Sequence, residues 1–156
     1  MTRLALLRHG DSSGRDLSPL GERQAAALGR QLRDLEPTPR QPRVVTSPAP
    51  RARQTASLVC SFLGLSGPLE ERRLWSGPDG APDSWENDPW WLLDRMEAWG
   101  RDVDLLVVIT HLEICATLPS LLAEHVGLPG VLPPGLARGQ GLYVDLAARS
   151  WRLLQG

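Results

Sequence analysis

A short apolar run that ends in a charged tripeptide occupies residues 4–10, LALLRHG. Four consecutive apolar residues predict a strand buried on both faces, because a half-exposed strand would alternate apolar with polar positions. The strand breaks off at Arg8-His9-Gly10, and a polar loop follows from Asp11 to Leu17. Ser18 and Pro19 then predict the start of a helix, since serine caps helix N-termini and proline fits the first turn. Strand, loop and helix in this order indicate the beginning of an α/β pattern.

Strands and helices alternate along the rest of the chain. The first helix is expected to end before Pro37, and three more helices are expected at about residues 51–63, at 89–99 and after His111. Further strands are expected in short apolar segments at residues 44–45 and 105–109, with 142–146 and 151–154 as candidates for a closing hairpin. This alternation predicts one three-layer α/β domain over residues 1–156, with a mainly parallel sheet flanked by helices on both faces.

Two segments lack any clear period and are interpreted as loops, residues 66–84 and 129–139. Four of the six tryptophans lie between residues 75 and 91, in and just after the first of these loops. We interpret them as packing under the loop, with an aromatic lid over a binding site as the alternative.

Length and composition are those of an ordinary globular domain. The chain has 156 residues, of which 42% are hydrophobic and 22% charged, and its formal net charge is −1. A charge this close to zero offers no general attraction to DNA or RNA, so no nucleic-acid partner is expected. No apolar run reaches the ~18 residues of a membrane span, and the first run is too short for a signal peptide. Cys60 and Cys115 stand among apolar residues, which argues against a disulfide framework, so a cytoplasmic protein is expected.

Charged and polar residues directly follow three of the predicted strands. The first strand ends at Arg8 and His9, the second ends shortly before Arg51, and the third ends at Thr110 and His111. Because the carboxyl ends of parallel strands meet at one edge of a sheet, where ligands bind, we expect two arginines and two histidines in one crevice.

These residue types suit phosphoryl transfer. Guanidinium groups are permanently charged forks that match phosphate oxygens, and a neutral imidazole can carry a phosphoryl group. A second histidine supplies a proton or positive charge to the oxygens, and phosphoryl transfer depends above all on positioning and charge neutralisation. Taken singly, His111 could be a buried structural histidine and Arg51 a helix-surface charge. Only their joint placement at successive strand ends favours a site.

Four segments carry a resemblance to a known family. They are Arg8-His9-Gly10, LSPLGERQA at residues 17–25, TSPAPRARQTA at 46–56 and VVITH at 107–111. Together they resemble the motifs of the histidine phosphatase superfamily, which includes the phosphoglycerate mutases, over about residues 3–118. The resemblance implies that His9 is the nucleophile, that Arg8 and Arg51 bind the phosphoryl oxygens and that His111 completes the pocket. It also implies that Ser47-Pro48 shape the turn that delivers Arg51.

The chain departs from the family pattern in two places. Leu112 follows the second histidine where the family usually has glycine, and no acid follows Arg73-Leu74 where many members carry the proton donor. Nearby candidates for the missing acid, none of them in the expected position, are Glu70, Glu71, Asp79, Asp83 and Glu86. A short middle segment without the usual donor resembles the small phosphohistidine phosphatase branch.

Other site chemistries find little support. The sequence has no G-x-S-x-G nucleophile elbow and, having no lysine, no phosphate-binding loop of the G-x-x-x-x-G-K type. His111 and Glu113 do not share a helix face, and His125 is interpreted as a charge near a helix end or a residue at the core edge. No metal site and no cofactor are therefore expected.

The expected function is a metal-independent phosphatase that forms a phosphohistidine at His9. Its substrate would be a phosphohistidine protein or a phosphorylated small molecule. A phosphoglycerate-type mutase and a small-metabolite phosphomonoesterase are alternatives with related chemistry. A non-catalytic, phosphate-binding regulatory module is the alternative from another class, favoured by Leu112 and the missing acid.

Overall fold

In the computed structural model, which describes residues 1–75 and 88–156, the apolar run forms β1 (Arg3–Arg8) inside a six-stranded sheet. The other strands are β4 (Pro42–Thr46), β5 (Leu69–Glu70), β6 (Leu105–Thr110), β7 (Gln140–Asp145) and β8 (Ser150–Gln155). The spatial order is β5-β4-β6-β1-β7-β8, with the first four strands parallel and β7 and β8 joining as an antiparallel hairpin. The mainly parallel sheet and the closing hairpin are confirmed.

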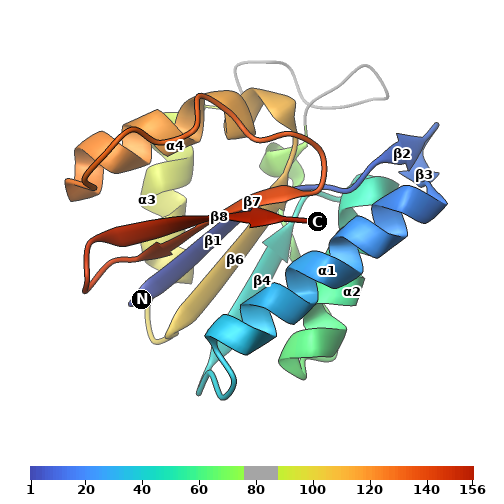
Figure 1. Ribbon diagram of the computed structural model, residues 1–156, viewed down its shortest axis with the longest axis horizontal. Coiled ribbons are helices and arrows are strands. Elements are labelled where there is room, and N and C mark those ends of the chain that lie inside the picture. Colours follow the sequence, from blue (N-terminus) through green and yellow to red (C-terminus); the bar gives the residue numbers. More distant parts are fainter. Residues whose placement is uncertain (76–87) are drawn as a thin grey trace.

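Two pairs of helices cover the two faces of this sheet (Figure 1). They are α1 (Pro19–Leu35) and α2 (Pro50–Leu63) on one face, with α3 (Pro89–Trp99) and α4 (Leu112–Val126) on the other. Alternate residues of β1 enter different cores: Leu4 and Leu6 pack with α3 and α4, whereas Leu7 packs with α1 and α2. A strand with a helical layer on each side needs apolar side chains at every position, which explains the unbroken apolar run. The predicted three-layer α/β domain is confirmed.

Helix boundaries follow the local signals in the sequence. The Ser18 hydroxyl accepts a hydrogen bond from the Gly21 backbone N–H at 3.0 Å and so caps α1. Gly64 ends α2 in the left-handed region with φ of 72°, a conformation that costs glycine little. The amino ends of α2 and α4 consequently stand directly after β4 and β6, at the edge where the strand ends meet.

The structure adds short elements that the sequence analysis interpreted as loop. The polar loop after β1 contains β2 (Ser12–Ser13) and β3 (Asp16–Leu17), which pair as a small antiparallel hairpin. The expected loop at 66–84 begins with β5 and a 3₁₀ helix, η1 (Arg72–Leu74), while its residues 76–84 lie outside the described residues. Two- and three-residue elements are too short to show a period, so only their pairing reveals them.

The tryptophans and cysteines behave largely as packing residues. Trp75 and Trp91 are partly buried against the two cores, which supports the packing interpretation for them, whereas Trp90 is exposed and Trp85 lies outside the described residues. Cys60 and Cys115 are buried and form no disulfide, as expected. Within residues 1–75 and 88–156, none of the helices is both long and apolar enough to span a bilayer.

Candidate active site

The ends of three neighbouring parallel strands bring His9, Ser47 and His111 together. The His9 backbone N–H donates to the Thr110 carbonyl at 3.2 Å, so pairing continues one residue past the end of β1. Ser47 extends β4 in the same way, donating from its backbone N–H to a carbonyl at the end of β6. The His9 and His111 rings lie edge to face with their centroids 5.0 Å apart, and both side chains are buried. The expected meeting of both histidines at one sheet edge is therefore observed.

The contacts of His9 define its tautomer. Nδ1 lies 2.8 Å from the Gly10 carbonyl oxygen, which can only accept, so the ring proton is on Nδ1. Nε2 then carries the lone pair, and it accepts a hydrogen bond from Nε of Arg51 at 3.3 Å. Burial, and secondarily the charges of Arg51 and Arg8, lower the pKa of His9 to about 4. At neutral pH His9 is therefore an uncharged imidazole with a basic Nε2.

A close backbone contact explains the glycine after His9. A Cβ atom at Gly10 would stand 2.5 Å from the Gly21 carbonyl oxygen, so a larger residue would push the first turn of α1 away. The Gly10 N–H donates to Thr55 Oγ1 at 3.2 Å, and Thr55 Oγ1 in turn donates to the Arg51 carbonyl at 2.9 Å. Thr55 thus joins the backbone behind His9 to the first turn of α2, a positioning role that sequence reasoning missed.

Arg8 approaches the site from the end of β1. Its Nη1 donates to the Leu136 carbonyl at 3.1 Å, while its Nε is buried and has no hydrogen-bond partner among the described residues. Burial, and secondarily the charge of Arg138, lowers the pKa of Arg8, but a guanidinium stays protonated at physiological pH. Because burying an unpaired charged donor is costly, this N–H is suited to receive an anion.

His111 is held by the turn that follows β4. Its Nε2 lies 2.7 Å from the Ser47 hydroxyl, and the same hydroxyl oxygen accepts a hydrogen bond from the Ala49 N–H at 3.1 Å. The Ser47 oxygen keeps a second lone pair beside the one that Ala49 uses, so its hydroxyl fits either ring tautomer; where the hydroxyl donates to Nε2, neutral His111 carries its own proton on Nδ1. That Nδ1 is buried and lacks a partner within the described part of the chain. Burial, followed by the nearby charges, lowers the pKa of His111 to about 3.

The site therefore combines two neutral imidazoles with two guanidiniums. Two of its buried nitrogen atoms, Nε of Arg8 and Nδ1 of His111, find no hydrogen-bond partner in the residues that the structure describes. Buried nitrogen atoms without a partner are rare in folded proteins, and beside two guanidiniums they are suited to bind an anion with several oxygens. A phosphoryl group has this chemistry.

The departures at Leu112 and in the middle segment have different consequences. Leu112 is exposed and begins α4 regularly, with His111 as its N-cap, so the replaced glycine does not disturb the imidazole. Of the candidate acids, Glu70 pairs with Arg53 at 2.9 Å, and Glu71 accepts from the Arg73 N–H at 3.1 Å. The other three, Asp79, Asp83 and Glu86, lie outside the described residues.

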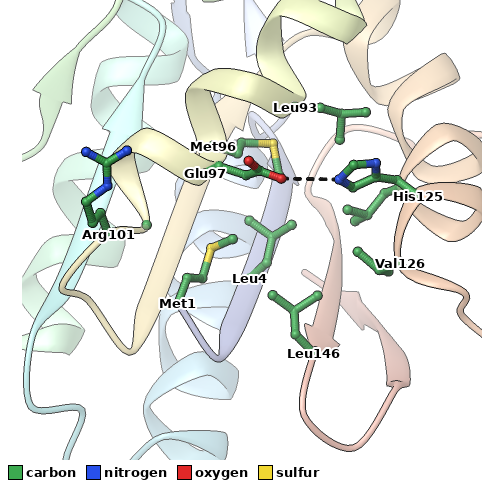
Figure 2. A pocket seen from close by; sticks show the side chains of 11 residues that line it. Met1, Leu4, Leu93, Met96, Glu97, Arg101, His125, Val126 and Leu146 are labelled. Carbon is green, nitrogen blue, oxygen red and sulfur yellow. Dashed lines mark hydrogen bonds and ion pairs between the residues drawn. The ribbon is translucent and has the colours of Figure 1, made fainter.

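The third histidine lies at the other edge of the sheet. His125 pairs with Glu97 at 3.2 Å beside a cavity of about 290 Å³ that is lined mainly by apolar residues, including Leu4 at the start of β1 (Figure 2). Because the amino end of β1 lies opposite the His9 edge, His125 is not part of the candidate active site. In residues 1–75 and 88–156, no three metal-ligating side chains lie close enough to hold a metal ion.

Comparison with known proteins gives a family match over part of the chain and a shared fold over nearly all of it. The family model of the histidine phosphatase superfamily (branch 1) matches residues 4–75, just under half of the chain, and this stretch contains Arg8, His9 and Arg51. Among curated protein sequences there is no significant match.

Solved structures extend the likeness over almost the whole chain. The protein histidine phosphatase SixA in complex with tungstate is 23% identical, with 98% of this chain and 96% of that chain covered and a TM-score of 0.68. A mycobacterial glucosyl-3-phosphoglycerate phosphatase in complex with VO3 is 23% identical, with 98% and 97% covered and a TM-score of 0.61. At this identity the structural likeness shows the fold alone. The family match over residues 4–75 and the fold over almost the whole chain make this protein similar to the histidine phosphatase superfamily, and they support a hydrolase that acts on phosphate esters.

Proposed function

We propose that this phosphatase works through a covalent phosphohistidine formed at Nε2 of His9. The observation that carries the proposal is the state of the His9 ring, which is buried, uncharged and protonated on Nδ1 through its bond to the Gly10 carbonyl. A nucleophile needs a lone pair, and this tautomer directs the lone pair of Nε2 towards the Arg51 guanidinium. The arginine that would bind the phosphoryl oxygens is thus already beside the attacking atom.

The reaction takes place in two steps. In the first, Nε2 of His9 bonds to phosphorus while the bond from phosphorus to the leaving group breaks, and the leaving group takes the electron pair. In the second, the oxygen of a water molecule bonds to phosphorus while the bond from phosphorus to Nε2 breaks. Phosphate departs, a proton of the attacking water passes to solvent, and neutral His9 is regenerated. Arg8 and Arg51 neutralise charge on the phosphoryl oxygens, and the Nδ1–H of His111 donates to a third oxygen. These fixed charges take the part that a metal ion plays in other phosphatases, so we propose metal-independent turnover.

The proposed substrate is phosphohistidine or a phosphomonoester with an easily expelled leaving group. Both described acids of the middle segment are engaged elsewhere, Glu70 with Arg53 and Glu71 with the start of η1. If neither of these two acids donates a proton, the enzyme favours leaving groups that depart as weak bases, and imidazole is such a group once its distal nitrogen is protonated. A phosphorylated small molecule is the second candidate, supported by the structural likeness to a glucosyl-3-phosphoglycerate phosphatase and by three further acids, Asp79, Asp83 and Glu86.

A labelling experiment tests the intermediate. The protein is incubated briefly with 4-nitrophenyl phosphate carrying radioactive phosphorus, quenched without acid and digested. We expect acid-labile, base-stable phosphate on the peptide that contains His9, turnover that persists in the presence of a chelator, and loss of both label and turnover in His9→Ala. His125→Ala is the matched control, because His125 lies at the opposite edge of the sheet. Turnover that survives in His9→Ala would refute the mechanism, and bound phosphate without turnover in the wild type would favour the regulatory module.

A further inference from the structure

The segment before β7 is fastened to the candidate active site by its backbone. The Leu136 carbonyl accepts from Nη1 of Arg8 at 3.1 Å, and the Gly139 N–H donates to the His9 carbonyl at 2.9 Å. Gly139 adopts a left-handed φ of 72°, which allows the chain to turn sharply into β7. Arg138 lies between these two anchored residues, so its backbone is fixed beside His9 although it stands far away in the sequence.

The side chain of Arg138 completes an exposed ion pair at the rim of the site. Its Nη1 lies 3.4 Å from Oδ1 of Asp11, and the two side chains are 47% and 36% exposed. Asp11 is itself positioned, because its Oδ2 accepts a hydrogen bond from the Ser18 hydroxyl at 2.6 Å. Ion pairs this open to water contribute little, so a competing anion can take the guanidinium from Asp11 at small cost.

The charge of Arg138 reaches the reacting groups. It lowers the pKa of His9 and of Arg8, behind the larger effect of burial in each case. A phosphoryl dianion is already matched by the guanidiniums of Arg8 and Arg51. The positive charge of Arg138 is therefore not needed to balance the two negative charges of the transferred group. Its present partner, Asp11, is an anion that an anionic group of a ligand can replace.

We propose that Arg138 binds a second anionic group of the substrate, attached on the leaving-group side, and so selects phosphorylated substrates that carry a carboxylate or a further phosphate next to the transferred phosphoryl group. The inference rests on the proposed function, since it assumes that the phosphoryl group occupies the pocket of His9, Arg8 and Arg51. Arg138 is a specificity residue in this scheme, and Asp11 holds it in place until the substrate arrives.

Binding of non-hydrolysable probes tests this assignment without requiring turnover. The first series runs from phosphonoacetate to 4-phosphonobutyrate, and calorimetry compares the affinity of each member with that of the alkylphosphonate of equal length. A second series consists of bisphosphonates with the same spacers. We expect the wild type to bind the best-fitting probe with a second anionic group about tenfold more tightly than the alkylphosphonate of equal length. The added hydrogen bond to Arg138 is charge-assisted but half exposed, which limits the gain. The two series show whether carboxylate or phosphate is the better second group.

Four variants show which residues carry the preference. Arg138→Gln should abolish the preference, whereas Asp11→Asn should increase it, because the competing carboxylate has lost its charge. Arg152→Gln is the matched control, an exposed arginine in β8 with no contact to the site, and should leave the preference unchanged. Arg51→Gln should weaken both members of each probe pair, which shows that the phosphonate occupies the expected pocket.

The outcomes separate this inference from the proposed function. A preference that persists in Arg138→Gln, or its absence in the wild type, overturns the role of Arg138 even if aryl phosphates are hydrolysed through His9. A preference that depends on Arg138 in a protein that forms no phosphohistidine leaves the binding assignment intact and refutes the proposed mechanism. Failure of every probe to bind the wild type overturns the inference as well.

Discussion

Nε of Arg51 donates a hydrogen bond to Nε2 of His9 at 3.3 Å, so the guanidinium occupies the lone pair that would attack phosphorus. In the proposed mechanism, the substrate takes over this guanidinium before Nε2 of His9 can attack phosphorus. A phosphoryl oxygen is a stronger partner for a guanidinium than a neutral imidazole, because both members of the new bond are charged. The proposed mechanism thereby couples binding of a phosphoryl group by Arg51 to release of the lone pair on Nε2 of His9.

Replacing Arg51 by lysine should reduce kcat/KM for 4-nitrophenyl phosphate by about 10²-fold, the effect typical of losing one preorganised donor to developing charge. Lysine keeps the charge but lacks the planar fork and cannot donate from the Nε position. Arg53→Ala is the control, because Arg53 is exposed and pairs with exposed Glu70. Steady-state kinetics with melting temperatures should show the loss in Arg51→Lys alone. Equal damage from the two changes would mean that Arg53, too, reaches the substrate.

Removal of the Ser47 hydroxyl should impair catalysis through His111. In Ser47→Ala the imidazole loses its 2.7 Å partner and can rotate or change tautomer, so we expect kcat to fall about tenfold with a smaller effect on KM. Nitrogen-15 shifts of the His111 ring report the tautomer directly and should change only in this variant. Ser61→Ala, an exposed serine in α2, should alter neither kinetics nor shifts. An unchanged His111 spectrum in Ser47→Ala would contradict the positioning role.

Both site histidines should remain uncharged in mildly acidic solution. Burial lowers the pKa of His9 to about 4 and that of His111 to about 3, so proton NMR at pH 5.5 should show two neutral rings, assigned with His9→Ala and His111→Ala. Since the unfolded chain takes up protons below its ordinary imidazole pKa of about 6.5, folding stability should increase with pH between about 4 and 6.5. Either variant should flatten this part of the stability profile. Titration of both rings near pH 6.5 would show that the site is open to water.

The identity of the leaving group should control the rate. A positioned acid is worth about 10²–10⁴-fold when an alkoxide departs, and neither described acid of the middle segment is free to supply it. A series of phosphate esters should therefore show kcat/KM falling steeply as the leaving group becomes more basic, with phosphohistidine and aryl phosphates preferred. A flat profile would reveal a donor, and Asp79→Asn, Asp83→Asn and Glu86→Gln would then identify it by making the profile steep.

The sequence alone determined the layers of the fold and most of the candidate site. The apolar runs of β1 and β6 have no polar alternation, and only strands covered on both faces tolerate this, so the parallel sheet between helices follows from local pattern. Parallel strands end at a common edge, and this rule alone places His9 and His111 in one crevice. The predicted meeting of the two rings is a direct consequence.

The tertiary structure decided which atoms meet. The bond between Ser47 and His111 joins residues 64 positions apart, and the bond from Arg8 to the Leu136 carbonyl spans 128 positions. The tautomer of His9, the tie through Thr55 and the ion pair of Arg138 with Asp11 depend in the same way on how helices and loops pack over the strand ends. Hydrophobic periodicity is a local property that a sequence displays directly, whereas a hydrogen bond needs two groups within about 3 Å, and packing of the whole chain sets that distance.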